Sequence, residues 1–154
     1  SVNTTEIWAG NTWATTGNYP TISCYVEGCG TTAAALAFGG YSNAAGTKTN
    51  IWSGSTWATT TDLLADIYGH AGCGTTGNAL TFGQTARSTP VEKWNGSSWS
   101  TTSSLIIGRY SPGESGNARD ALCFGGSSAA GQYPLETERW LSTGLQKGFA
   151  VKIN

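Results

Sequence analysis

The chain has 154 residues, with 22 glycines, seven tryptophans and no methionine, and only 11% of its residues are charged. Eight basic and nine acidic residues leave a net charge of −1 with no run of either sign, which excludes the basic stripe of nucleic-acid-binding proteins. No apolar stretch approaches the ~20 residues that span a bilayer, so we expect no membrane insertion. Helical periodicity is absent and the composition favours strands, so we expect a single all-β domain over 1–154.

A four-residue segment ending in tryptophan recurs along the chain, at Thr5–Trp8, Thr49–Trp52, Val91–Trp94 and Thr137–Trp140. The four tryptophans are 44, 42 and 46 positions apart. In the first three copies a second tryptophan follows five residues later, at Trp13, Trp57 and Trp99. A repeat of this length, made of short β segments, is typical of propeller blades. We therefore expect repeat units at about 4–46, 47–88 and 89–135, with a degenerate closing unit at 136–154.

The second half of each repeat unit is expected to supply the first two strands of a four-stranded sheet. The glycine-rich stretches 28–33, 72–77 and, more weakly, 113–116 predict an innermost strand, because small residues fit where strands converge on an axis. An apolar second strand then ends in phenylalanine 30 residues after the first tryptophan of the unit, at Phe38, Phe82 and Phe124. Leu and Phe point to one face of this strand and Ala, Thr or Cys to the other, so the small face can lie against a neighbouring sheet.

The segment that ends in the first tryptophan predicts the third strand, and the segment that begins with the second tryptophan predicts the fourth. Ser53–Thr56 and Asn95–Ser98 lie between them and contain Ser-Gly and Asn-Gly, which favour tight hairpin turns. The chain thus begins with strands three and four, continues through two complete sets of four, and ends in an incomplete set. In the closing unit Leu145 replaces the second tryptophan, and residues 149–153 resemble one more strand.

This count predicts about 14 strands, or roughly three and a half blades. Closed propellers have typically four to eight blades. An arc of three and a half blades leaves two sheet edges open to pairing with another chain. We therefore expect a homo-oligomer in which two copies complete a seven-bladed ring.

The strand that ends in Phe-Gly-Gly, with a tryptophan following after a loop, resembles the kelch motif of β-propellers. Tryptophan stands here in place of the usual tyrosine, and the second unit has Gly83-Gln84 in place of Gly-Gly. The run 94–99, Trp-Asn-Gly-Ser-Ser-Trp, together with Ala-Leu-x-Phe-Gly-Gly, looks like the kelch-like arrays of marine bacteriophage tail and other virion structural proteins. Those arrays often carry Ala-Arg after the fourth strand, where this chain has only Gly108-Arg109. The resemblance covers residues 4–140.

The resemblance implies a non-enzymatic structural or adhesion protein of a virion, tail-associated or on the capsid surface. Its partners would be other virion proteins and a host surface glycan or protein. The alternative is a carbohydrate-binding propeller lectin, which would be secreted. A propeller hydrolase is the third and least favoured reading. Several readings stay open because kelch-like propellers serve many functions, and function must be argued from the site.

The strict periodicity of the aromatic residues favours packing between sheets over sugar stacking. We expect this structural role for Trp8, Trp13, Phe38, Trp52, Trp57, Phe82, Trp94, Trp99, Phe124 and Trp140. Recognition residues are expected instead at positions of the loops that do not repeat. The candidates are Tyr19, Tyr41, Arg87 and Tyr133.

No catalytic residue, metal ligand or cofactor is expected. The recurrent carboxylates Glu6, Glu92 and Glu138 occupy equivalent positions on different sheets, whereas glycoside hydrolysis needs two carboxylates about 5 to 10 Å apart across one cleft. They are expected to form repeated hydrogen bonds in the strands or hairpins. The only histidine is His70, and it has no partner of recognisable catalytic spacing. The four cysteines are expected to be free thiols that pack as small hydrophobes, with one disulfide as the alternative: Cys24, Cys29, Cys73 and Cys123. Free thiols favour assembly of the virion protein in a reducing cytoplasm, that of the host.

Overall fold

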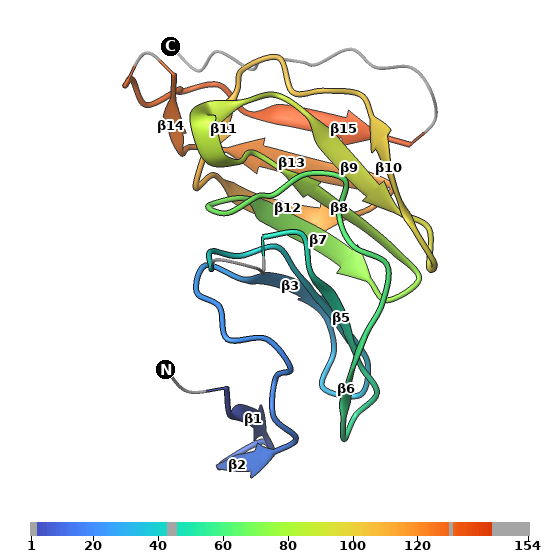
Figure 1. Ribbon diagram of the computed structural model, residues 1–154. Coiled ribbons are helices and arrows are strands. Elements are labelled where there is room, and N and C mark those ends of the chain that lie inside the picture. The colour runs from blue at the N-terminus through green and yellow to red at the C-terminus, as the bar shows by residue number, and fades with distance from the viewer. Residues whose placement is uncertain (1–2, 43–45, 130, 143–154) are drawn as a thin grey trace.

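The computed structural model describes residues 3–42, 46–129 and 131–142, and it is all-β, with several small antiparallel sheets (Figure 1). The described residues contain a single short 3₁₀ helix, η1 (Thr85–Arg87), and no helix among them could cross a membrane. The near absence of helix is as expected. It follows from a sequence in which glycine, threonine and turn residues interrupt every apolar run.

The strands form a hairpin, three larger sheets and one short strand pair. The hairpin consists of β1 (Thr5–Trp8) and β2 (Trp13–Thr16). Sheet 1 has the order β3 (Glu27–Gly30), β4 (Ala35–Phe38), β5 (Thr49–Trp52) and β6 (Trp57–Thr59). Sheet 2 has the order β7 (Ala71–Thr75), β8 (Asn78–Phe82), β9 (Val91–Trp94) and β10 (Trp99–Thr102). Sheet 3 has the order β12 (Gly113–Asn117), β13 (Asp120–Phe124) and β15 (Glu138–Leu141). The short pair is β11 (Arg109–Tyr110) with β14 (Ser127–Ser128).

The expected strand order is confirmed: two strands, two complete antiparallel sets of four, and an incomplete set. The sequence repeat straddles two sheets, since a unit such as 47–88 supplies the last two strands of sheet 1 and the first two of sheet 2. The first strand of sheet 1 was expected within residues 28–33. It ends earlier, because β3 stops at Gly30, where the chain turns into β4. The pair β11–β14 was not expected. Leu145 and the tail strand at 149–153 lie outside the described residues.

The hairpin turns between the third and fourth strands follow the expected chemistry. Gly54 and Gly96 adopt φ values of 91° and 100°, which glycine tolerates at no steric cost. The Asn95 side chain accepts hydrogen bonds from the backbone N–H groups of Ser97 and Ser98 and so closes the second of these turns. Cross-strand tryptophan pairs flank both turns, with ring centroids 5.3 Å apart for Trp52 and Trp57 and 5.4 Å for Trp94 and Trp99.

The sheets pack face to face, and the large side chains of one sheet lie on the small side chains of the next. Between sheets 1 and 2, Leu36 and Phe38 pack with Ala79 and with the tryptophan pair of sheet 2. Between sheets 2 and 3, Leu80 and Phe82 pack with small residues of sheet 3, Ala121 and Cys123. Figure 1 shows the β1–β2 hairpin below sheet 1, sheet 1 below sheet 2, and sheet 3 overlapping sheet 2 in the upper part of the view.

Tryptophan side chains also link neighbouring sheets by hydrogen bonds. Trp57 Nε1 donates to Thr5 Oγ1 of the hairpin at 2.8 Å, and Trp99 Nε1 donates to Thr49 Oγ1 of sheet 1 at 2.9 Å. In both pairs the fourth-strand tryptophan reaches back to the threonine that opens the third strand of the preceding sheet. A buried N–H that finds a partner avoids a penalty of about 1–3 kcal/mol, so this contact fixes how one sheet sits on the next.

The aromatic repeat positions are buried inside the stack and exposed at its two ends. Phe38 and Phe82 have exposed fractions of 0% and 3%, whereas Phe124 has 41%. Trp13 is 64% exposed and Trp8 is also exposed. The packing role expected for all ten residues thus applies to those with a neighbouring sheet. Trp8, Trp13 and Phe124 differ because no further sheet covers them in the described part of the chain.

Candidate functional site

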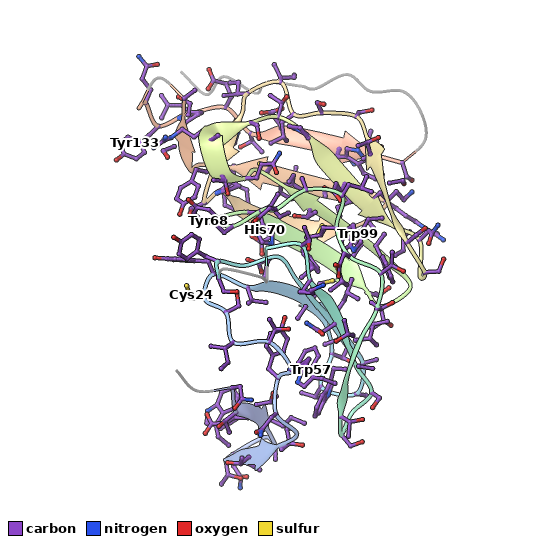
Figure 2. All side chains as sticks on the ribbon, viewed as in Figure 1. Cys24, Trp57, Tyr68, His70, Trp99 and Tyr133 are labelled. Atoms are coloured by element: carbon purple, nitrogen blue, oxygen red, sulfur yellow. The ribbon has the colours of Figure 1, made fainter. Side chains whose placement is uncertain are left out.

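The longer loops gather at one end of the sheets. In an antiparallel meander, the loop that enters the first strand and the loop that leaves the second strand lie at the same end. The opposite end carries only the tight hairpins of each sheet. Figure 2 shows the loop residues Cys24, Tyr68 and Tyr133 on one side of the molecule and Trp99 toward the other.

Four tyrosines form a continuous aromatic surface at the loop end, which we name the tyrosine row: Tyr25, Tyr41, Tyr68 and Tyr110. Tyr68 lies at its centre. Its ring centroid is 4.9 Å from Tyr41 and 6.0 Å from Tyr110, both edge-on, and 6.3 Å from Tyr25. Tyr25 and Tyr41 are mostly exposed. The row therefore presents aromatic faces and hydroxyl groups together at the surface.

A repeat position with a left-handed backbone conformation lies within the row at Tyr25 and directly after Tyr68 and Tyr110. Tyr25, Gly69 and Ser111 occupy equivalent places ahead of the first strands of the three sheets, and their φ values are 56°, 61° and 49°. A non-glycine residue at positive φ costs of order 1 kcal/mol or more, and such strain concentrates at functional sites. A Cβ at Gly69 would overlap the ring of Tyr110, so glycine at this position lets Tyr110 lie close to Tyr68.

The four predicted recognition residues lie in different surroundings. Tyr41 belongs to the tyrosine row. Tyr19 packs edge-on against Trp57 at 5.1 Å, and its hydroxyl accepts a hydrogen bond from Asn50 at 3.0 Å, so it contributes to the packing of sheet 1. Arg87 is exposed in η1 and donates from Nε to Ser127 Oγ at 3.3 Å. Tyr133 is exposed in the loop between β14 and β15.

Sequence reasoning missed Tyr25, Tyr68 and Tyr110. A usable signal was present, because Tyr68 and Tyr110 each lie 11 residues after the second tryptophan of their unit. The periodic tryptophans and phenylalanines are assigned to packing, and the equal spacing of these two tyrosines is not used. Periodicity shows only that residues share a structural position, and that position can lie at the surface.

Two of the recurrent carboxylates hold loops between the sheets in place, whereas hydrogen bonds within strands or hairpins were expected. Glu92 Oε2 accepts a hydrogen bond from the backbone N–H of Leu64 at 2.9 Å, and Glu138 accepts from Ile106 and Ile107 in the equivalent loop. Burial raises the pKa of Glu92, and the hydrogen bond from Leu64 lowers it. These carboxylates therefore stabilise the loops at this end of the sheets.

The β11–β14 pair adds a buried arginine to this arrangement. Arg109 is fully buried and approaches Glu138 Oε1 with Nε at 3.3 Å and Nη2 at 3.2 Å. Its remaining N–H groups donate to the carbonyl oxygens of Gly125 and Glu136, at 2.9 and 2.8 Å. A buried charge is tolerated only when it is paired and hydrogen-bonded in this way. Arg109 of β11 thereby joins the two ends of the β13–β15 loop.

The cysteines are free thiols, as expected. Burial raises the pKa of Cys29 and of Cys123 to about 12 and that of Cys73 to about 11, so these three remain protonated and unreactive. Cys24 is exposed and donates to the carbonyl oxygen of Tyr41 at 3.4 Å. Among the residues described, no group of three or more His, Cys, Asp or Glu side chains is placed to hold a metal ion.

A cavity of about 170 Å³ lies between sheets 2 and 3, and Phe82, Val91 and Trp140 are among its lining residues. Phe82 and Val91 are the counterparts of Phe38 and Thr49, which contact Trp99 between sheets 1 and 2. The cavity therefore lies where the repeat would place a tryptophan.

His70 is buried between sheets 1 and 2, and one ring nitrogen, Nε2, lies 3.2 Å from the carbonyl oxygen of Phe38. Burial lowers its pKa to about 4, although the hydrogen bond to Phe38 opposes this. Between pH 6.5 and 4 the unfolded chain therefore binds a proton that the folded chain does not. The free energy of unfolding should fall over this range by up to about 3 kcal/mol.

Urea unfolding at pH 7, 5.5 and 4 measures this loss. His70→Val introduces the residue of the equivalent position, Val26, and should remove the histidine part of the pH dependence while the carboxylate part remains. An identical pH dependence in the two proteins would contradict the burial of a neutral His70.

No protein-family model and no curated protein matches this sequence.

Proposed function

We propose that this protein is a non-enzymatic, kelch-like propeller of a phage virion, tail-associated or on the capsid surface, which adheres to a host surface through its tyrosine row. The proposal combines the sequence resemblance with the antiparallel sets of four strands, whose stacked arrangement suits propeller blades. A second copy of the chain would complete the ring. Other virion proteins would be its assembly partners.

The tyrosine row is the observation that supports adhesion. Tyrosine offers a large, rigid contact area at low entropic cost, together with a hydroxyl group that can donate and accept hydrogen bonds. Three rings surround Tyr68, so the row is already ordered before a partner arrives. Repetition of such a surface in a multimeric particle would raise the avidity of individually weak contacts.

A carbohydrate-binding lectin, acting as a secreted protein, is the second candidate. The same row favours it, because an aromatic face flanked by hydroxyl groups can stack on a pyranose ring and bond to its hydroxyls. The two candidates differ in where the protein is found. Stoichiometric copies in purified particles, measured by mass spectrometry, support the virion role, whereas a secreted protein absent from particles supports the free lectin.

Tyr68→Ala is expected to weaken binding by about tenfold or more on a glycan array or on intact host cells, because it removes the central ring of the row. Tyr133→Ala is the matched control, since Tyr133 is exposed at the loop end and outside the row. It should leave binding unchanged. Loss of binding in the Tyr133 variant alone would place recognition on the β14–β15 loop and contradict the role of the row.

A further inference from the structure

The two ends of the sheet stack expose complementary halves of the contact that joins sheets 1 and 2. In that contact Phe38 and Thr49 of sheet 1 receive Trp99 of sheet 2. The ring centroids of Phe38 and Trp99 are 5.0 Å apart, and Trp99 Nε1 donates to Thr49 Oγ1 at 2.9 Å. The contact thus has two sides. Phe38 and Thr49 of sheet 1 form the aromatic and threonine side, and Trp99 of sheet 2 forms the tryptophan side.

Sheet 3 presents the aromatic and threonine side without a partner. Phe124 and Thr137 occupy the positions of Phe38 and Thr49, and Phe124 is exposed, as is the neighbouring Leu122. Thr137 Oγ1 has no hydrogen-bond partner within the described ranges. The β1–β2 hairpin presents the tryptophan side, since Trp13 occupies the position of Trp99 and its Nε1 likewise has no partner there.

The identities of these residues vary together along the chain. Thr5 pairs with Trp57 and Thr49 pairs with Trp99. In the third copy of the segment, Val91 replaces the acceptor threonine. The tryptophan that would pair with it belongs to the fourth copy, where the sequence has Leu145. Acceptor and donor are therefore replaced together in the sequence. The pattern leaves one acceptor, Thr137, and one donor, Trp13. A polar pair retained at the two ends is unexplained by packing within one chain.

We propose that these ends join two copies of the chain head to tail, with Trp13 of one copy on Phe124 of the other and its Nε1 donating to Thr137. The contact continues the spacing of the internal sheets without displacing β15 from sheet 3. The hairpin and sheets 1 to 3 of two copies would then form a ring of eight units, and not the seven blades expected from the sequence. Two copies related by a two-fold axis make this contact twice and close the assembly. The proposal rests on the part of the proposed function in which a second copy completes the ring. It concerns a surface separate from the tyrosine row, so the dimer contact and adhesion through the row can fail independently.

Sedimentation of the full chain over a concentration series tests the association. The wild-type chain should form a dimer. Trp13→Ala and Phe124→Ala should each weaken it by roughly thirtyfold or more, as expected for aromatic residues central to an interface. Tyr133→Ala, which changes an exposed aromatic residue outside both ends, should have no effect.

Mixing the two variants provides the decisive result. Each variant alone has one defective side in both contacts, whereas the mixture can form one contact in which both sides are intact. Dimers should therefore reappear in the mixture. Thr137→Val, which copies Val91, and Trp13→Phe should show non-additive losses in a double-mutant cycle. A wild-type monomer at all concentrations, dimers unaffected by the single changes, or a mixture without recovery would each overturn the proposal.

Discussion

Replacing Phe38 by alanine should lower the free energy of unfolding by about 3–5 kcal/mol, whereas the same change at Phe124 should cost about 1 kcal/mol or less. The two residues occupy the same repeat position, at the end of the second strand. Phe38 is fully buried against the next sheet, and Phe124 has no such neighbour. The difference therefore measures what a covering sheet contributes to one side chain.

Urea unfolding followed by tryptophan fluorescence measures both values, at a protein concentration where the chain is monomeric. Phe82→Ala is the matched control, because Phe82 is buried between sheets 2 and 3 and should behave like Phe38. Equal losses at all three positions in the monomer would show that Phe124 is covered within a single chain. That result would contradict the open end of sheet 3.

Arg109→Ala should lower the free energy of unfolding by about 3–5 kcal/mol, because it leaves the buried carboxylate of Glu138 without its cation. The carbonyl oxygens of Gly125 and Glu136 lose their donors at the same time. We expect the loss to appear first as local opening of the β13–β15 loop, since Arg109 joins its two ends. Hydrogen exchange of the backbone amides in this loop would detect the opening.

The matched control is Arg139, which lies on β15 next to Glu138. Arg139 pairs with Asp120, with Nε 2.7 Å from Oδ1, but both side chains are about half exposed. Arg139→Ala should leave the unfolding curve almost unchanged, because water solvates both partners when the pair is broken. If the two substitutions had equal effects, the buried pair would not anchor sheet 3.

Adhesion through the tyrosine row and association through Trp13 and Phe124 are tested with different variants. Variants of Tyr68 test adhesion in a chain whose association is intact, and variants of Trp13 test association in a chain whose row is intact. A virion protein of the proposed kind needs both properties. A rigid assembly presents the loop ends in a fixed orientation, and multivalent binding depends on that geometry.

Much of the fold could be predicted because the sequence repeats it. Four copies of one motif placed the strands, and the alternation of Leu and Phe with small residues assigned the two faces of each second strand correctly. Hairpin turns followed from Ser-Gly and Asn-Gly. These features are local, since strand periodicity and turn preferences act over a few residues.

Less of the candidate site than of the fold could be predicted from the sequence. Tyr25, Tyr41, Tyr68 and Tyr110 come from four separate segments, and only stacking of the sheets brings their rings together. Tyr19 shows the opposite outcome, because a loop position that does not repeat became part of the packing of sheet 1. Repetition in a sequence reports a shared structural position but not the burial of that position.

The sequence by itself determined the repeat, the strand order within each sheet and the residues that face the neighbouring sheet, because each depends on short-range periodicity. Only the tertiary structure decided which repeat positions are covered. Phe38 and Phe124 have the same place in the motif, and they differ because burial depends on whether another sheet packs on top. The same physical reason assembled the tyrosine row and left Trp13 and Thr137 at opposite ends of the stack.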